Sequence, residues 1–314
     1  MSQPSIYDNK VNVEIKPIGS FEEHISSLET IRFNPTNKAQ FLTGSHDMSV
    51  RLWDVERPAS LHVFTGHEQG VWAVDVHPSG KFFASTGPDG SIQVADLTSR
   101  SVVQKLEGTF EKGYWLKFSA DGKFLLASGQ SGALQLIDTV SFKNIATRSF
   151  ETSIVYCAKF LEGQSKIVCC TSEGDICLLS EKLEPISTTN TGKQEIRSIE
   201  LLGPNKLVAS SENGNLRFYQ MEDEGSKLTL AESLKAHKSP LTFLRFDEKN
   251  DFLYSTAKDS SVFAWQASSL QLRHNLVGHL DQVSCVDVNA DGSLVGTSSW
   301  DQTAKVFRLS DISK

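Results

Sequence analysis

The sequence predicts an all-β fold, a single seven-bladed β-propeller closed by an N-terminal strand in the last blade. Three observations predict it: a motif that recurs seven times along the 314 residues, short alternating apolar runs within each repeat, and turn signals between the runs. The composition is that of a folded domain with a sizeable core, because 39% of the residues are hydrophobic and 22% are charged.

The repeated motif is clearest in Ser45–Asp54, with the sequence SHDMSVRLWD. Its seven copies have their turn anchors at residues 47, 89, 131, 173, 213, 259 and 301. Five of the six steps between anchors are 40 or 42 residues, and the step from 213 to 259 is 46 residues. This is the period of a four-stranded propeller blade. The longer step contains Glu222–Ser226, which we interpret as a solvated loop between outer strands of blade 5.

Each repeat has the pattern of short strands. Apolar and polar residues alternate in Val50–Trp53 after the first anchor, and Phe82–Ser85 forms an apolar run before the second. Pro78–Gly80 and Asp89-Gly90 are turn signals between such runs.

These features define one propeller domain over residues 11–314. The repeats are predicted at about residues 20–64, 65–106, 107–148, 149–189, 190–234, 235–276 and 277–310. Residues 1–10 are expected to be a flexible tail. Residues 11–18, with alternating Val11–Ile15, are expected to close blade 7 as its outer strand beside Ala304–Phe307, because an unclosed ring leaves exposed strand edges.

Dipeptides in the repeats identify the family. Trp53-Asp54 is a WD pair, Gly66-His67 and Gly278-His279 are GH pairs, and Glu23-His24 and Ala236-His237 are degenerate forms. The chain resembles WD40-repeat proteins over about residues 20–310. That resemblance implies that a His, a strand Ser or Thr, a turn Asp and a Trp form a buried hydrogen-bonded set in each complete blade.

Four blades hold such a set. Its members are His24, Thr43, Asp47 and Trp53 in blade 1, His67, Ser85 and Asp89 in blade 2, His237, Ser255, Asp259 and Trp265 in blade 6, and His279, Thr297 and Asp301 in blade 7. Ala95 and Phe307 replace the Trp in blades 2 and 7. In blades 3 to 5 the hydroxyl position is Ala127, Cys169 or Ala209, and the His and the turn Asp are lost with it. Joint loss is expected, since a half-satisfied buried polar network costs more than an apolar replacement.

Catalytic motifs are missing from the sequence. It contains no P-loop, His-Glu-x-x-His, Gly-x-Ser-x-Gly or Gly-x-Gly-x-x-Gly pattern. Cys157, Cys169, Cys170 and Cys177 lack metal-ligand spacing and are interpreted as buried thiols. We therefore expect no enzyme activity, no catalytic residue, no metal and no cofactor.

Charge and cysteine content indicate the kind of partner. The net charge of −7 disfavours a phosphate backbone, so we expect no direct nucleic-acid binding. Five cysteines without framework spacing, no signal-peptide pattern and no apolar run of about 18 residues indicate an intracellular protein of the cytoplasm, the nucleus or both, with no membrane partner. We expect protein partners in a multisubunit complex and a monomeric isolated subunit.

The resemblance places partner binding on the face where the innermost strands begin. Seven equivalent positions there are Glu29, Trp72, Tyr114, Tyr156, Arg197, Thr242 and Ser284. The residues just before the turn anchors include His46, Glu212, Lys258 and Trp300. We predict that Trp72, Tyr114, Tyr156 and Trp300 form an aromatic arc, with Arg197, Glu29, His46, Glu212 and Lys258 as its polar side. Aromatic residues and Arg dominate binding hot spots, although the same side chains could also pack locally at the channel mouth.

A narrower resemblance is carried by Gly66–Val71, by Gly113–Ser119 in the His-less blade 3, and by Asp281–Val283. These segments resemble the WD-repeat subunits of Ski complexes, which are shared with the Paf complex; Ala95-Asp96 and Ser180 depart from the WD dipeptide. This resemblance implies a scaffold that supports RNA decay by the exosome or transcription elongation. Two alternatives stay open: a reader of a modified peptide or histone tail on the aromatic face, and a substrate receptor or transport-complex subunit. The blade sides also remain a possible main binding surface.

Overall fold

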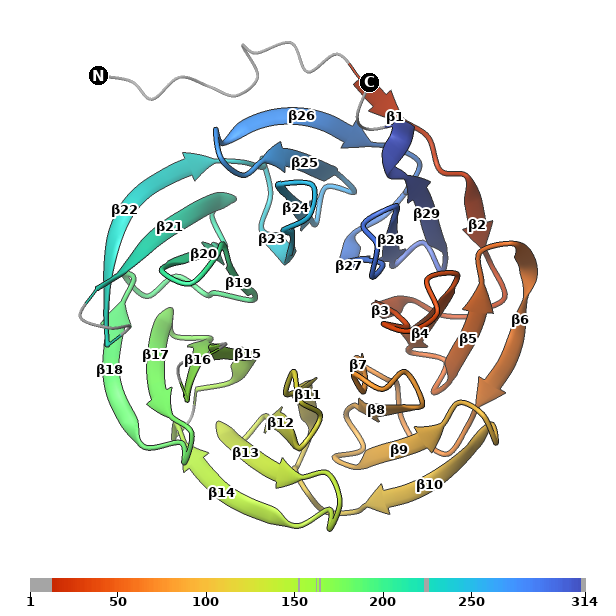
Figure 1. Cartoon of the computed structure of the whole chain (residues 1–314), viewed down its shortest axis with the longest axis horizontal. Helices are drawn as coiled ribbons and strands as arrows, with labels where there is room; N and C mark the ends of the chain where they lie inside the picture. Colours follow the sequence, from red (N-terminus) through yellow and green to blue (C-terminus); the bar gives the residue numbers. More distant parts are fainter. Residues whose placement is uncertain (1–12, 152, 162, 164, 223–225, 312–314) are drawn as a thin grey trace.

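The structure is a computed structural model. It describes residues 13–151, 153–161, 163, 165–222 and 226–311. Their strands form seven sheets arranged as a ring around a central axis (Figure 1). The predicted seven-bladed β-propeller is confirmed. Within each blade, consecutive strands pair antiparallel, and the first strand of the blade is the one nearest the axis (Figure 1).

The first four blades follow one plan. Blade 1 contains β3 (Leu28–Phe33), β4 (Gln40–Ser45), β5 (Val50–Asp54) and β6 (Arg57–Phe64). Blade 2 contains β7 (Ala73–Val76), β8 (Phe82–Thr86), β9 (Ile92–Asp96) and β10 (Ser101–Leu106). Blade 3 contains β11 (Gly113–Phe118), β12 (Phe124–Gly129), β13 (Ala133–Asp138) and β14 (Asn144–Ser149). Blade 4 contains β15 (Val155–Leu161), β16 (Lys166–Thr171), β17 (Asp175–Ser180) and β18 (Pro185–Asn190).

The last three blades include the N-terminal strands. Blade 5 contains β19 (Ile199–Leu201), β20 (Lys206–Ser210), β21 (Asn215–Glu222) and β22 (Lys227–Lys235). Blade 6 contains β23 (Leu241–Asp247), β24 (Phe252–Ala257), β25 (Val262–Gln266) and β26 (Gln271–Leu276), with β1 (Val13–Ile15) added at its edge. Blade 7 contains β27 (Val283–Val288), β28 (Leu294–Ser299) and β29 (Ala304–Arg308), with β2 (Gly19–Phe21) as its outer strand. A short 3₁₀ helix, η3 (Leu309–Asp311), follows.

The ring is closed by a different strand from the one predicted. β2 pairs antiparallel with β29, with Phe21 opposite Ala304. The predicted pairing of Val13–Ile15 with blade 7 is wrong, because β1 runs parallel to β26 of blade 6, with Ile15 opposite Leu276. At the end of the predicted segment 11–18, Ile18 does donate its backbone N–H to Val306 of β29 at 2.7 Å. Residues 11 and 12 of that segment and the predicted tail, 1–10, lie outside the described residues.

Chain length explains this difference. In the other six blades the outer strand ends six to nine residues before the next innermost strand begins. β2 ends seven residues before β3, whereas β1 ends thirteen residues before it. The closing strand is held by Phe21, which is buried and packs edge-to-face on Phe41 at 4.9 Å and on Trp53 at 5.4 Å between ring centroids.

The long step between repeats lies in blade 5. β21 and β22 are the longest hairpin of the structure, pairing from Asn215 opposite Lys235 to Glu222 opposite Lys227. The predicted loop, 222–226, connects these two outer strands, and its residues 223–225 lie outside the described part of the chain.

Candidate protein-binding surface

A buried set of polar side chains holds the loops of blade 1 in place. His24 Nδ1 lies 2.6 Å from Asp47 Oδ2, and His24 Nε2 lies 2.7 Å from Thr43 Oγ1. The indole N–H of Trp53 donates to the same Thr43 hydroxyl at 2.7 Å. The His comes from the loop before β3 and the Asp from the β4–β5 turn, so the set joins two loops at one end of the blade.

Blades 2, 6 and 7 contain related arrangements, without the Trp in blades 2 and 7 and with a serine between His and Asp in blade 6. His67 and His279 contact Asp89 and Asp301 at 2.7 and 2.8 Å, and contact Ser85 and Thr297 at 2.8 and 2.7 Å. In blade 6, His237 contacts Ser255 and Ser261, each at 2.7 Å, and Ser261 donates to Asp259. Trp265 donates to Ser255 at 2.8 Å, and His237 lies 3.8 Å from the Asp259 carboxylate. We call the face that carries these four Asp turns the arc face.

The hydrogen bonds perturb the turn carboxylates. Burial raises the pKa of Asp47, but the hydrogen bonds from His24 and Ser49 outweigh it and hold that pKa well below its usual range. The pKa of Asp301 is lowered in the same way by His279. In blades 1, 2 and 7 the Asp also accepts a hydrogen bond from the backbone N–H of the residue after its His, as Ile25 and Leu280 show at 3.3 and 3.0 Å. The turns are therefore fixed, together with the residues just before them.

Bulges in the innermost strands direct a second group of side chains. A register shift interrupts pairing between these strands and their neighbours at Glu29, Tyr114, Tyr156, Thr242 and Ser284. A β-bulge leaves one residue unpaired and re-aims its side chain. At Gly113 the absence of a side chain lets blades 2 and 3 approach closely, since a Cβ there would overlap the Thr86 hydroxyl.

The predicted aromatic side chains lie together. The ring of Trp72 is 4.8 Å from that of Tyr114 between centroids, and Tyr114 is 5.8 Å from Tyr156 in an edge-to-face arrangement. The imidazole of His46 lies 6.4 Å from Trp72 on one side and 6.4 Å from Trp300 on the other. We call Trp300, His46, Trp72, Tyr114 and Tyr156 the aromatic arc; it crosses blades 7, 1, 2, 3 and 4.

One end of the arc is anchored by a carboxylate. Glu29 Oε1 accepts a hydrogen bond from the Trp300 indole at 2.9 Å and lies 2.8 Å from His46 Nε2. The hydrogen bond to Glu29 raises the pKa of His46. Trp300 is still 42% exposed, so its ring is positioned but open to a partner.

The other end of the arc is anchored by a cation. The guanidinium of Arg197 lies 5.2 Å from the centroid of the Tyr156 ring, and its Nε is 2.5 Å from Glu195 Oε1. Burial, together with the Glu195 carboxylate, raises the pKa of Tyr156 to about 12. Glu212 and Lys258, the other two predicted polar residues, are exposed.

Four residues of this surface were not predicted from the sequence. Glu195 precedes its strand by several residues, and no repeat position marks it. Ile25 and Leu280 are 83% and 90% exposed, and Met48, in the blade 1 turn, is also exposed. Ile25 and Leu280 each directly follow the His of a His–Asp set. An apolar residue at that sequence position could have predicted their exposure on this face. They extend the apolar surface around blades 7 and 1.

The cysteines and histidines do not gather into a metal site in the described part of the chain. All five cysteines are buried free thiols, and Cys157 opposes Cys170 while Cys169 opposes Cys177 in the blade 4 sheet. Among the described residues, no helix is long and apolar enough to cross a membrane.

Comparison with known proteins gives relatives of the same repeat type. The chain is 26% identical to transducin beta-like protein 3 of Bos taurus over 91% of this chain and 37% of that protein. It is 23% identical to actin-interacting protein 1 of Drosophila melanogaster over 93% of this chain and 41% of that protein. It is 24% identical to the guanine nucleotide-binding protein subunit beta of Saccharomyces cerevisiae over 96% of this chain and 60% of that protein. The chain thus spans less than two thirds of the length of each of these relatives.

The family model described as "WD domain, G-beta repeat" matches residues 15–54, 58–96, 228–266 and 270–308. These segments make up half of the chain, and each ends in the third strand of blade 1, 2, 6 or 7, the blades that hold the His–Asp sets. On this match and on its seven-bladed architecture, the chain belongs to the WD40-repeat family.

Proposed function

We propose that this protein is a non-enzymatic platform for protein–protein interaction, and that the aromatic arc is its principal binding site. The observation that carries the proposal is the continuous contact from Trp300 through His46, Trp72 and Tyr114 to Tyr156. Large rings that are fixed by their neighbours and still reach solvent lose little conformational entropy when a partner binds.

The relatives support the broad class of function. One is named as a subunit and another as an actin-interacting protein, so both names describe association with other proteins. Partner identity is a separate matter, because the same fold serves many partners.

The contacts within the arc favour an apolar or aromatic side chain as its occupant. Adjacent rings from Trp72 to Tyr156 are in direct contact, which leaves no gap between them for an ammonium group. The cation site over Tyr156 is already taken by Arg197. A reader of methylated lysine would need such a site open, so the platform function is better supported than the reader function.

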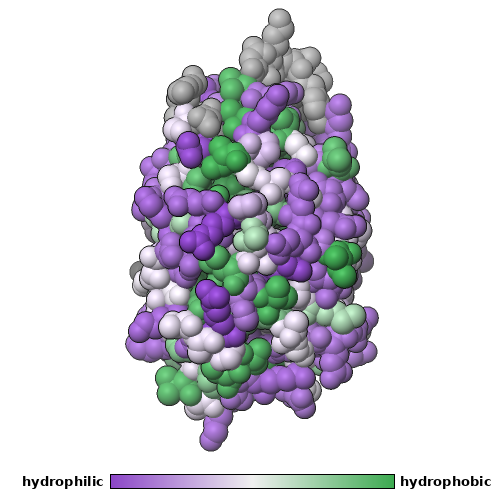
Figure 2. Space-filling model, turned by 90° about the vertical axis from the view of Figure 1, so that its right-hand side faces the viewer, coloured by the Kyte–Doolittle hydropathy of each residue, from purple (hydrophilic) through white to green (hydrophobic). Residues whose placement is uncertain are grey.

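The outer edge of the disc is a weaker candidate surface. Figure 2 shows that hydrophobic residues on one side of this edge are scattered among hydrophilic ones, within the part that the structure describes. Exposed apolar residues such as Val140, Ile145 and Ile186 do lie on the outer strands and loops of blades 3 and 4. They supply a matched comparison for the arc.

Membership of a Ski-type complex is the narrower part of the proposal. It rests on the sequence resemblance of Gly66–Val71, Gly113–Ser119 and Asp281–Val283 alone. Trp72 and Tyr114, which belong to or directly follow these segments, are central to the arc, so a partner of that complex would bind there. We also propose that the protein acts in the cytoplasm, the nucleus or both, because its five cysteines lack the spacing of a disulfide framework.

The test compares two triple variants by affinity purification and mass spectrometry. One is Trp72→Ala/Tyr114→Ala/Trp300→Ala; the other is Val140→Ala/Ile145→Ala/Ile186→Ala on the outer edge. We expect the arc variant to lose the stoichiometric partners of the wild type, and the edge variant to keep them. Circular dichroism checks that both variants are folded. Retention of all partners by a folded arc variant would contradict the proposed site, and stoichiometric partners unrelated to a Ski helicase or its scaffold would contradict the narrower part.

A further inference from the structure

A ring of charged residues lines the lower half of the central channel, opposite the arc face. It occupies the position three residues after Glu29 of blade 1 and after the equivalent residue of every other blade, and its members are Arg32, Asp75, Lys117, Lys159, Glu200, Arg245 and Asp287. Four members are cationic and three are anionic. A complete charged ring at an otherwise buried position of seven strands is costly, so its members must be paired or must serve a ligand.

The anionic members of the ring are buried and form ion pairs and hydrogen bonds. Asp75 lies 2.9 Å from Lys117 Nζ and 3.7 Å from Arg32 Nε, and it also accepts the backbone N–H of Phe118 at 2.9 Å. Asp287 lies 3.0 Å from Arg245 Nε and accepts the backbone N–H of Phe33 at 2.8 Å. These two carboxylates therefore join neighbouring blades.

The cationic members retain donors that face the channel. Lys159 pairs with Glu200 at 2.6 Å. The side chains of Lys117 and Arg245 are 31% and 33% exposed, whereas those of Asp75, Glu200 and Asp287 are 3%, 9% and 7% exposed. An ammonium has three donors and a guanidinium has five, so one ion pair does not satisfy either group. The side chains of Lys159 and Arg32 are only 12% and 9% exposed, so Lys117 and Arg245 make up most of the surface that the ring presents to solvent.

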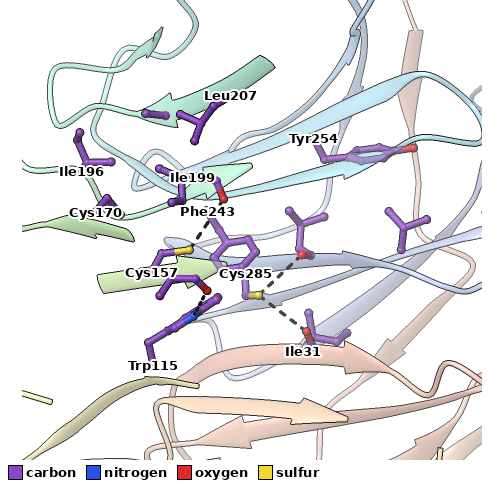
Figure 3. Close-up of a cluster of buried hydrophobic side chains, with 14 of the residues drawn as sticks. Ile31, Trp115, Cys157, Cys170, Ile196, Ile199, Leu207, Phe243, Tyr254 and Cys285 are labelled. Atoms are coloured by element: carbon purple, nitrogen blue, oxygen red, sulfur yellow. Dashed lines mark hydrogen bonds between the residues drawn. The ribbon is translucent and has the colours of Figure 1, made fainter. Parts of the chain in front are cut away.

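The channel is closed above the ring. Trp115 of blade 3 and Phe243 of blade 6 meet across the axis with ring centroids 5.8 Å apart, and both are almost fully buried. Arg32 of blade 1 stacks on both rings, at 5.7 and 5.0 Å. Figure 3 shows Trp115 and Phe243 next to Cys157 and Cys285 in this layer. The lower mouth is thus a blind cavity and not part of an open pore.

This cavity has the size of a small-molecule site. It measures about 690 Å³, and Lys117, Lys159 and Arg245 line it together with Asp75 and Glu200. Its rim is largely apolar, with Phe118, Phe160, Leu201 and Phe246, and it carries one further acidic residue, Glu248. The lining therefore holds three cationic and three anionic side chains, and the apolar rim lowers the local dielectric beside the partly exposed Lys117 and Arg245, which strengthens their attraction for an anion.

We propose that this cavity binds a compact group with two or more negative charges, held by Lys117, Lys159 and Arg245. Phosphoryl and carboxylate groups share this chemistry, and both accept charge-assisted hydrogen bonds from Lys and Arg. The site stands out because the protein as a whole carries a net charge of −7, which repels anions elsewhere on its surface.

Isothermal titration calorimetry on the full chain tests the proposal with two probes, sodium tripolyphosphate and a hexaglutamate peptide, at low ionic strength. We expect one equivalent of at least one probe to bind, and Lys117→Met to weaken its binding about tenfold or more. Lys117 is chosen because Asp75 keeps Arg32 and the Phe118 N–H as partners. The matched control is Lys81→Met, an exposed lysine that does not line the cavity. The tighter probe identifies phosphoryl or carboxylate groups as the preferred source.

A second variant tests binding in the cavity without altering the charge of its lining or the stability of the fold. Ala120 is exposed at the rim of the cavity, so Ala120→Trp obstructs the mouth without changing the charge or the core. It should also reduce binding about tenfold, with an unchanged circular dichroism spectrum. Failure of both probes to bind, equal loss in the Lys117 and Lys81 variants, or undiminished binding by Ala120→Trp would overturn the proposal.

Discussion

The indole of Trp300 donates a hydrogen bond of 2.9 Å to the carboxylate of Glu29, which joins blade 7 to blade 1 on the arc face across 271 positions of sequence. The same carboxylate oxygen lies 2.8 Å from His46 Nε2. One anionic side chain therefore fixes two rings of the aromatic arc and keeps the proton on the imidazole to a higher pH.

Substitution of that carboxylate tests this relationship. We expect Glu29→Gln to lower the pKa of His46 toward its ordinary value of about 6.5, because the neutral amide no longer stabilises the charged imidazole. Titration of the His46 ring signals by NMR measures the change. Glu212→Gln, an exposed substitution on the same face, is the control and should leave the His46 titration in place. An unaltered pKa in Glu29→Gln would mean that the contact does not control His46.

The strand that closes the ring gives a second prediction. Phe21→Ala should lower the free energy of unfolding by about 3–5 kcal/mol, because it removes a buried ring that packs on Phe41 and Trp53 at the junction of blades 7 and 1. Val13→Ala, a partly exposed residue of the neighbouring β1, should cost less than about 1 kcal/mol. Urea unfolding measures both. A larger loss for Val13→Ala would place closure of the ring in β1 instead.

The fold was predictable from the sequence because the same pattern of strands and turns occurs seven times. The approximate period and the alternation recur in all seven repeats, so the lost turn Asp of blades 3 to 5 and the 46-residue step do not obscure the pattern. The closing strand was predicted wrongly because Val11–Ile15 alternates better than Gly19–Phe21. Its pairing is decided by the length of chain before β3 and by burial of Phe21, which a single alternating segment does not encode.

The candidate surface was only partly predictable. The repeat places Trp72, Tyr114 and Tyr156 at equivalent positions, and the structure puts their rings in contact. The partners of the arc come from other blades or loops: Glu29 reaches Trp300, and Glu195 reaches Arg197. Such pairs depend on side-chain direction, and the charged channel ring likewise becomes apparent only when equivalent positions of the seven blades are aligned.

The hydroxyl shared within a His–Asp set is a third test. Thr43→Val removes the partner of both His24 Nε2 and Trp53 Nε1 while preserving shape, so two buried polar groups lose their hydrogen bond. The expected loss of stability is about 2–4 kcal/mol. The matched control is Thr229→Val on an exposed position of β22, which should stay within about 0.5 kcal/mol of the wild type. Equal unfolding midpoints for the two variants would show that the set contributes nothing to stability.

The buried imidazoles predict how stability depends on pH. Burial lowers the pKa of His237 and His279 in the folded protein, despite their carboxylate partners, and burial also lowers that of His274. The unfolded chain takes up protons at these residues near pH ~6.5, where the folded protein does not, so the free energy of unfolding should fall as the pH drops from about 7.5 to about 5.5. The turn carboxylates stay ionised in both states across this window, because their folded pKa values are lowered further.

His46 acts in the opposite direction and provides the control. Its raised pKa adds stability that is present below the unfolded pKa and is lost as the pH rises through the folded pKa, although its partial exposure keeps the contribution small. His46→Gln removes that opposing contribution, so the decline of stability toward low pH should become steeper than in the wild type. Urea unfolding of both proteins at the two pH values measures the slopes. A variant that is as stable at the lower pH as at the higher one would show that His237 and His279 accept protons in the folded state as readily as in the unfolded chain.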